Sequence, residues 1–313
     1  MFGKWQKLSS YVGLVFLSVI SSLLAELSRD DFGGYPYNPV TIPLIVESIK
    51  ICLSTFLLFS GRTGPLYTYV AENCELTHFI LFAVPAACYF ISNTCMFFIV
   101  ADIGLVRYHV LGNLKVVFSA CAMRVLLGRV LVLKQWIAIF LLIFGMVLAQ
   151  WQSEDEVHPA GNRPRGYILA VMASAASSAG GVYSEKLLKG CLGGENIHWK
   201  NIQLYIWGVL FSIFAVHQTG RGLMIESFLD GYTLMVITMA FLMSLTGIIV
   251  SYILKYTDSL SKSLVASLAI VISAFVQIFR GIDPFSPRLF VGASLIFYAL
   301  TLYEENLSGK TRA

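Results

Sequence analysis

Apolar stretches long enough to cross a lipid bilayer recur along almost the whole of this 313-residue chain. A membrane-spanning helix needs about 20 predominantly apolar residues. The lipid interior admits only helices or closed barrels, because every backbone polar group there must be hydrogen-bonded within the protein. Hydrophobic residues make up 57% of the sequence and charged residues 13%, against roughly 25% charged residues in a soluble domain. The sequence therefore predicts an integral membrane protein without a separate soluble domain.

The apolar stretches divide into ten spans that are too long and too continuous for barrel strands. They cover residues 9–28, 39–60, 77–100, 104–127, 132–151, 166–188, 201–219, 232–255, 261–280 and 286–304. The run Tyr11–Leu27 follows a basic N-terminus but precedes no small-residue cleavage site, so we interpret it as a retained first span. The fold class that we expect is an all-α membrane protein of ten transmembrane helices, forming one transmembrane domain over residues 1–313.

The basic residues favour one orientation of these spans. With the N-terminus in the cytosol, more Lys and Arg residues fall at cytosolic ends than at the opposite ends, as the positive-inside rule requires. Because the number of spans is even, both termini are expected in the cytosol.

A weak internal repeat relates the two halves of the chain. FFIVADIGLVRYHV at 97–110 aligns with YILKYTDSLSKSLV at 252–265, so that Asp102 matches Asp258. Ten spans then divide into a first repeat, 1–151, and a second repeat, 166–304, each of five spans. Since five is odd, the second repeat enters the membrane from the opposite side. Such a 5+5 inverted repeat is typical of a transporter whose substrate site lies near the bilayer centre.

Motifs of soluble-enzyme chemistry are absent from the sequence. It contains no Walker sequence, dinucleotide fingerprint, H-E-x-x-H or nucleophile elbow. The six cysteines and five histidines show no metal-ligand spacing. The net charge of +4 is too small to indicate nucleic acid as a partner. We therefore expect no enzyme activity, no catalytic residue, no metal and no cofactor. The partner that the composition does predict is the lipid bilayer.

Lys115 stands well inside the predicted span 104–127, where a charge is costly unless an anion or a water-filled cavity receives it. Its counter-ion is either Glu47 on another span or a ligand. Lys262 occupies a related place in the second half, although a lysine at a helix end can also extend its ammonium to the interface. Glu47 and Lys50 are three residues apart on one helical face. Their spacing predicts an internal ion pair, and a gating role for it stays open.

Polar and small residues surround these charges. Tyr89 and Asn93 are four apart on one face of the third span, and an aromatic ring with an amide is what recognition of a nucleobase requires. Paired lysines suit a diphosphate or a phosphodiester. The small residues at 173–181 indicate close helix packing, room for a ligand, or both.

Four sequence blocks resemble the nucleotide-sugar transporters of the Golgi and endoplasmic reticulum. The similarity is to the branch of CMP-sialic acid, UDP-galactose and UDP-N-acetylglucosamine carriers, within the drug/metabolite transporter superfamily. The blocks are YFISNTCMFFIVADIGLVRYHVLGNLKV (89–116), LGRVLVLKQWIAIFLLIFGMVLAQ (127–150), SSAGGVYSEKLLKG with HWKNIQLYIWG (177–208), and TGIIVSYILKYTDSLSKSLVASLAIVISA (246–274).

The resemblance assigns roles to individual residues of this chain. It implies that Lys115 and Lys262 bind the phosphates, and that Tyr89 and Asn93 hold the pyrimidine with Tyr108 nearby. The rest of the pocket would be lined by Ser177, Gly181, Asn201 and Tyr205, with Lys255 near its cytosolic mouth. The chain departs from the family at Asn113, where Gln is frequent, at Thr94, and at Ser263 after Lys262. These departures leave the sugar unassigned.

The resemblance also implies an activity. Such carriers exchange a cytosolic nucleotide sugar for a luminal nucleoside monophosphate by alternating access, here a CMP- or UDP-sugar for CMP or UMP. The absence of a G-A-L-N-K type motif favours a pyrimidine over GDP-mannose. The location expected is the Golgi membrane, with the endoplasmic reticulum as the alternative. The rival functions are a carrier of another phosphorylated metabolite and a non-transporting scaffold for glycosyltransferases. A homodimer and a glycosyltransferase complex are the assemblies left open.

Overall fold

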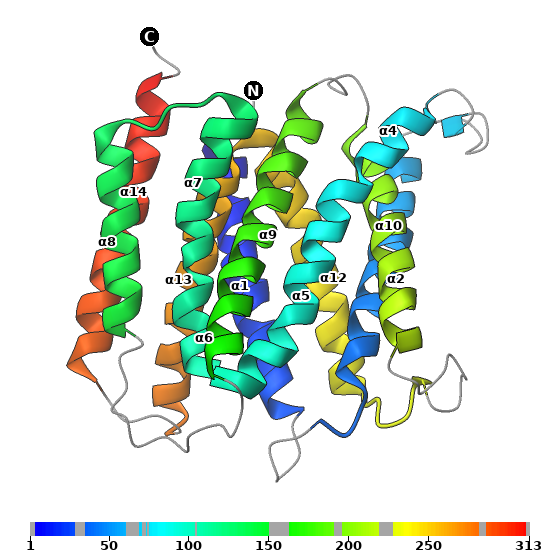
Figure 1. Cartoon of the computed structure of the whole chain (residues 1–313), viewed down its shortest axis with the longest axis horizontal. Helices are drawn as coiled ribbons and strands as arrows, with labels where there is room; N and C mark the ends of the chain where they lie inside the picture. The colour runs from blue at the N-terminus through cyan, green and yellow to red at the C-terminus, as the bar shows by residue number, and fades with distance from the viewer. Residues whose placement is uncertain are drawn as a thin grey trace. The chain divides into compact units, whose positions relative to one another are not determined.

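A computed structural model of the chain describes residues 4–28, 35–60, 69–70, 73, 75–103, 105–149, 163–190, 196–218, 228–281 and 286–310. Within these ranges the regular secondary structure is helical, and no strand occurs (Figure 1). The elements are α1 (Lys4–Leu27), η1 (Pro39–Thr41), α2 (Ile42–Ser60), α4 (Leu76–Leu81), α5 (Ala83–Ile103), α6 (Leu105–Gly112), α7 (Leu114–Leu127), α8 (Leu133–Ala149), α9 (Arg163–Lys189), α10 (Ile197–Gln218), α12 (Leu234–Tyr256), α13 (Ser259–Phe279) and α14 (Pro287–Lys310).

Seven helical stretches in the described ranges are long and apolar enough to cross a membrane. They are Trp5–Ala25, Pro39–Ser60, Leu76–Val100, Val110–Leu127, Ile197–Gln218, Leu234–Tyr256 and Ser259–Phe279. Helices α8, α9 and α14 cover the three remaining predicted spans with 17, 27 and 24 residues. The all-helical class predicted from the sequence is confirmed, whereas the number of ten spans stays a prediction.

The helices form two compact units, and each unit takes helices from both predicted repeats. Unit 1 consists of residues 1–90 and 187–256, and unit 2 of residues 91–186 and 257–313. Helix α5 contributes residues to both units. The units therefore differ from the two sequence halves, whose first boundary, at 151, lies outside the described residues.

Unit 1 is built around α2. This helix packs against α10 and α12, and α12 also packs against α1. Tyr37, Ile42, Val46, Met239 and Ala240 belong to a buried cluster in this unit. The chain enters α2 through η1, where the side chain of Asn38 accepts a hydrogen bond from the backbone of Val40.

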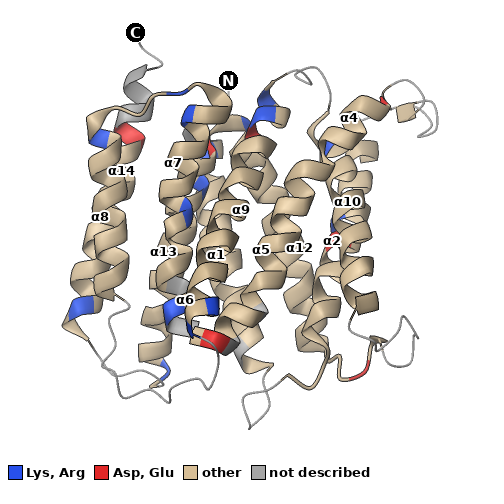
Figure 2. Cartoon of the chain, in the orientation of Figure 1, with Lys and Arg blue, Asp and Glu red and all other residues tan. Residues whose placement is uncertain are grey.

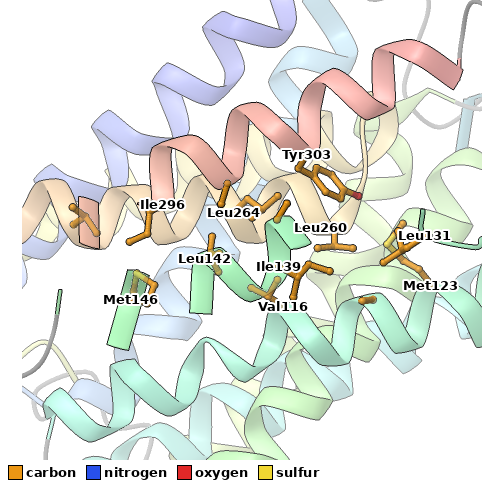
Figure 3. Packing of buried hydrophobic residues seen from close by; sticks show 14 of the residues in the cluster. Val116, Met123, Leu131, Ile139, Leu142, Met146, Leu260, Leu264, Ile296 and Tyr303 are labelled. Carbon is orange, nitrogen blue, oxygen red and sulfur yellow. The ribbon is translucent and has the colours of Figure 1, made fainter. Parts of the chain in front are cut away.

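Unit 2 contains a larger apolar core, part of which Figure 3 shows. Val116 and Met123 of α7 meet Leu142 of α8, Leu264 of α13 and Ile296 of α14 in this core. Helices α8 and α14 lie side by side (Figure 1).

Two glycines allow α8 and α14 to approach so closely. A Cβ atom added to Gly292 of α14 would lie 2.5 Å from the carbonyl oxygen of Gly145 of α8. A Cβ atom on Gly145 would lie 2.9 Å from the carbonyl oxygen of Gly292. Backbone contact of this kind is a common means of helix association in lipid.

Candidate functional site

The regular helix of the fourth predicted span has a one-residue break shortly before Lys115. Helix α6 ends at Gly112 and α7 begins at Leu114, and Asn113 between them is the N-cap of α7. Asn113 keeps right-handed helical φ and ψ angles of −73° and −13°, and Val110–Leu127 still forms one stretch long and apolar enough to cross a membrane. Lys115 is therefore the second residue of α7, directly after a local irregularity within the predicted span 104–127.

The side chain of Asn113 joins the helices that carry the two lysines. Its Oδ1 atom accepts a hydrogen bond of 3.1 Å from the hydroxyl of Ser267 on α13. Asn113 is 2% exposed and Ser267 is fully buried. The side chain of Asn113 therefore faces α13, and its amide oxygen accepts a hydrogen bond within unit 2.

Lys115 and Lys262 come together in unit 2. The helices that carry them, α7 and α13, pack against each other, and Val116 and Leu264, close to the two lysines in the chain, belong to one buried cluster. Both lysine side chains are partly exposed. In the described part of the chain, Lys115 takes part in no ion pair. Figure 2 shows that most charged residues lie toward the ends of the helices and few along their middles. Two neighbouring cations in such surroundings form a favourable place for an anion.

Two carboxylates accept hydrogen bonds from backbone amides at the start of α13, close to Lys262. The amide of Ser259 donates a hydrogen bond of 2.7 Å to Oε2 of Glu185 on α9. The amide of Ser261 donates one of 2.7 Å to Oδ1 of Asp258, the N-cap residue. A helix N-terminus can bind anions through such free amides. Here Glu185 and Asp258 accept hydrogen bonds from two of them.

The two aspartates that the repeat aligns both form ion pairs at helix junctions of unit 2. Asp102 near the end of α5 accepts two hydrogen bonds, of 2.7 and 2.8 Å, from Arg165 at the start of α9. Asp258 lies 3.3 Å from Arg129 and also accepts a hydrogen bond from Tyr303. The hydrogen bond to Asp102 and the charge of that carboxylate raise the pKa of Arg165 above its ordinary value. Each aspartate therefore links the end of one helix to another segment of unit 2.

A second polar cluster lies in unit 1, around the predicted pair Glu47 and Lys50. The Nζ atom of Lys50 donates a hydrogen bond of 2.6 Å to Oε1 of Glu47. The same ammonium stands 5.1 Å from the ring centroid of Tyr205 on α10, within cation–π range. The Tyr205 hydroxyl lies 3.3 Å from that of Ser251 on α12. Glu47 is therefore the partner of Lys50 in unit 1.

Glycines of two neighbouring helices make room for this ion pair. A Cβ atom on Gly208 of α10 would lie 3.0 Å from the side-chain atoms of Glu47, and one on Gly247 of α12 would overlap the side chain of Lys50. The charged side chains are thus seated directly on the backbones of α10 and α12. The cluster is a built feature of unit 1, since three helices are shaped around it.

The other predicted residues of unit 1 have different surroundings. Tyr89 is partly exposed and lies near Tyr205. Asn201 is 1% exposed, and neither polar atom of its side chain has a hydrogen-bond partner among the described residues. Lys255 has its ammonium 5.4 Å from the ring centroid of Tyr256. A buried amide without partners is costly, so Asn201 is a position where a ligand or a water would restore hydrogen bonds.

The remaining predicted residues belong to unit 2. Asn93 on α5 is exposed, and Ser177 on α9 is partly exposed. Gly181 on α9 is buried. Tyr108 on α6 packs against a small apolar cluster that includes Ile99. Unit 2 thus holds six of the predicted residues: Asn93, Tyr108, Lys115, Ser177, Gly181 and Lys262.

Nothing in the described ranges is arranged as a metal site. No three His, Cys, Asp or Glu residues lie close enough there to hold a metal ion. The described cysteines Cys52, Cys88, Cys95 and Cys121 are free thiols.

Sequence reasoning missed the contacts that α9 makes with both lysine-bearing helices. The Ser178 hydroxyl lies 2.7 Å from the carbonyl oxygen of Lys115, and Glu185 caps α13. The available signal was the spacing of these two residues. Positions seven apart on a helix share one face, which would have placed both on the same stripe of α9.

The arrangement of helices and charges defines a multi-helix membrane protein with a cationic site, and comparison with known proteins gives its family. The nucleotide-sugar transporter family model matches residues 4–304 of the chain. The chain belongs to the nucleotide-sugar transporter family.

Individual relatives agree with this membership. The chain is 28% identical over 307 residues to CMP-sialic acid transporter 1 of Arabidopsis thaliana, covering 94% of this chain and 89% of that protein. It is 26% identical over 286 residues to the UDP-N-acetylglucosamine transporter of Rattus norvegicus, covering 86% of each. A solved crystal structure resembles the fold with a TM-score of 0.62 at 14% identity, covering 95% of this chain and 98% of the other.

Proposed function

We propose that this chain is an antiporter that carries a pyrimidine nucleotide sugar, either a CMP-sugar or a UDP-sugar, into the Golgi lumen in exchange for the nucleoside monophosphate. The observation that carries the proposal is the pair of lysines in unit 2. Lys115 and Lys262 lie on the packed helices α7 and α13, and Lys115 has no carboxylate partner in the described ranges. A phosphate group would neutralise both charges.

The choice of a pyrimidine base is supported by the relatives. One relative is a CMP-sialic acid transporter and another a UDP-N-acetylglucosamine transporter. Their nucleotides share a pyrimidine and differ in the number of phosphates and in the sugar. The proposal therefore commits to a pyrimidine nucleotide and leaves the sugar to experiment.

The proposed binding residues are those that the family resemblance implies. Lys115 and Lys262 bind the phosphates, and Tyr89 and Asn93 hold the pyrimidine with Tyr108 nearby. The rest of the pocket is lined by Ser177, Gly181, Asn201 and Tyr205, with Lys255 near its cytosolic mouth. The unsatisfied amide of Asn201 supports its inclusion.

The proposed architecture is the 5+5 inverted repeat of ten transmembrane helices with both termini in the cytosol. The seven membrane-crossing stretches together with α8, α9 and α14 supply the ten. In this arrangement no covalent step is needed, since transport consists of binding, reorientation and release.

The experiment is counterflow in proteoliposomes. Vesicles containing the purified chain are preloaded with CMP or UMP, and uptake of labelled CMP- and UDP-sugars is measured. We expect the internal nucleotide to stimulate uptake of at least one of these sugars. If no nucleotide sugar enters and no nucleotide raises the melting temperature, the antiporter proposal fails and the scaffold alternative gains. Uptake of a different phosphorylated metabolite alone would favour the other carrier.

One variant tests the phosphate role. Lys115→Ala should lower exchange by at least about tenfold, because a hydrogen bond to a charged group is worth roughly 1.5–3 kcal/mol. Lys134→Ala is the matched control, since Lys134 is exposed at the start of α8. Unchanged exchange in folded Lys115→Ala protein would show that this lysine does not bind the phosphate.

A further inference from the structure

One stripe of α9 contacts both helices that carry the lysines of unit 2. The hydroxyl of Ser174 donates a hydrogen bond of 3.2 Å to the carbonyl oxygen of Leu111 in α6. The hydroxyl of Ser178 lies 2.7 Å from the carbonyl oxygen of Lys115 itself and 2.7 Å from that of Ser174 on its own helix, so the two acceptors share one donor. Glu185 accepts the hydrogen bond from the amide of Ser259 at the start of α13. All three side chains are buried.

The spacing of Ser174, Ser178 and Glu185 places all three on one face of α9. At 100° per residue, positions 174, 178 and 185 fall within a narrow sector of one helix. Ser174 and Ser178 therefore meet the break between α6 and α7, and Glu185 meets the start of α13 about two turns further along the same face. A single rigid helix holds the backbone at both lysines.

The start of α13, and with it Lys262, is held by further contacts in addition to the one with Glu185. Lys262 is three residues after Ser259, and its own amide bonds to the carbonyl oxygen of Asp258. Asp258 is in turn held by Arg129 and Tyr303. The first turn of α13 is thus held by Glu185 of α9 and by Asp258 with its partners Arg129 and Tyr303.

We propose that Ser178 and Glu185 are positioning residues, through which α9 sets the separation of the Lys115 and Lys262 ammonium groups and hence their fit to a phosphate group. The inference rests on the proposed function, because it concerns the same pair of lysines. Ser178 acts through Lys115 and Glu185 acts through Lys262. Neither side chain needs to touch the substrate.

The test is a double-mutant cycle on nucleotide binding by the purified full-length chain. The dissociation constants of CMP and UMP are measured for wild type, Glu185→Ala, Lys262→Ala and the double variant. We expect Glu185→Ala to weaken binding of the preferred nucleotide by about tenfold in the wild-type background. In the Lys262→Ala background the same change should have less than about a twofold effect, because residues that act through one another are not additive.

A second cycle pairs Ser178→Ala with Lys115→Ala and should show the same coupling. Glu185→Gln keeps an oxygen that can accept the Ser259 hydrogen bond, so it should recover part of the lost affinity. If Lys262→Ala abolishes measurable binding, Lys262→Arg provides the second background. The controls are Ser294→Ala, whose exposed hydroxyl bonds only to its own helix, and Glu305→Gln, whose side chain is exposed. Both should bind as wild type does.

Three results would overturn the inference. Equal loss of affinity in both backgrounds would show a general structural effect instead of positioning. Wild-type affinity in Glu185→Ala and Ser178→Ala would show no effect at all. A wild-type protein that binds neither CMP nor UMP would refute the proposed function first, and the positioning role would fall with it. The wild-type measurement therefore separates the two failures.

Discussion

Replacing Lys50 by Met should destabilise unit 1 through the carboxylate that it leaves behind. The Lys50 and Glu47 side chains are 13% and 20% exposed, with 2.6 Å between Nζ and Oε1. Breaking a fully buried ion pair from one side costs about 3–5 kcal/mol, because the remaining charge is uncompensated. Since Glu47 retains some exposure to solvent, we expect about 1–3 kcal/mol. Loss of the cation–π contact with Tyr205 adds about 1 kcal/mol.

The double variant Glu47→Gln/Lys50→Met separates the cost of an orphaned charge from the value of the pair. Removing both charges of a buried pair is often close to neutral, so the double variant should be more stable than Lys50→Met. A free-energy change of 1 kcal/mol shifts the melting temperature of a chain of 150–250 residues by about 2–4 °C. With a total of about 2–4 kcal/mol, we therefore expect a fall of roughly 4–16 °C for Lys50→Met and at most half of that for the double variant.

The assay is thermal unfolding of purified protein in detergent at one fixed heating rate, because membrane proteins often unfold irreversibly. A double variant as unstable as the single variant, or less stable, would refute the reasoning that the two residues form one compensated unit. Counterflow on the same proteins addresses gating. If the pair is structural, the double variant should keep most of its exchange activity.

Two further predictions concern helix contacts of unit 2. Gly292→Ala should lower the melting temperature by several degrees, because the new Cβ would meet the carbonyl oxygen of Gly145 at 2.5 Å, and overpacking typically costs about 1–3 kcal/mol. Gly112→Ala is the matched control, since a Cβ there meets nothing within 4 Å. Equal effects of the two substitutions would contradict this account. Arg165→Lys should lower the melting temperature although it conserves charge, because the two hydrogen bonds to Asp102 need the planar guanidinium. A wild-type melting temperature would show that the bidentate geometry contributes nothing to stability.

The helical class and the approximate spans could be predicted because they depend on local composition. A run of about 20 apolar residues is sufficient to indicate a membrane helix, and α2, α10, α12 and α13 all lie close to their predicted ranges. The break at Asn113 was not predictable in this way. The residues on both sides of it are apolar, and the contact that accompanies it comes from Ser267, 154 residues further along the chain.

Individual features of the candidate site could be predicted from the sequence, but the way they come together could not. Local spacing was enough to place Glu47 and Lys50 on one face, three residues apart. The contacts of Asp102 with Arg165 and of Ser178 with Lys115 each join residues 63 positions apart. Because hydropathy says nothing about which helices are neighbours, such contacts require the fold. The proposal of a pyrimidine nucleotide rests on the family and its relatives, and no single residue carries it.

The close approach of α8 and α14 has a consequence for how the protein is made. Helices α9, α10, α12 and α13 stand between the two in the chain, and synthesis proceeds at roughly 5–20 residues per second from the N-terminus. The face of α8 around Gly145 is therefore inserted well before Gly292 emerges from the ribosome. During that interval this face of α8 lacks the backbone contact that Gly292 of α14 later provides.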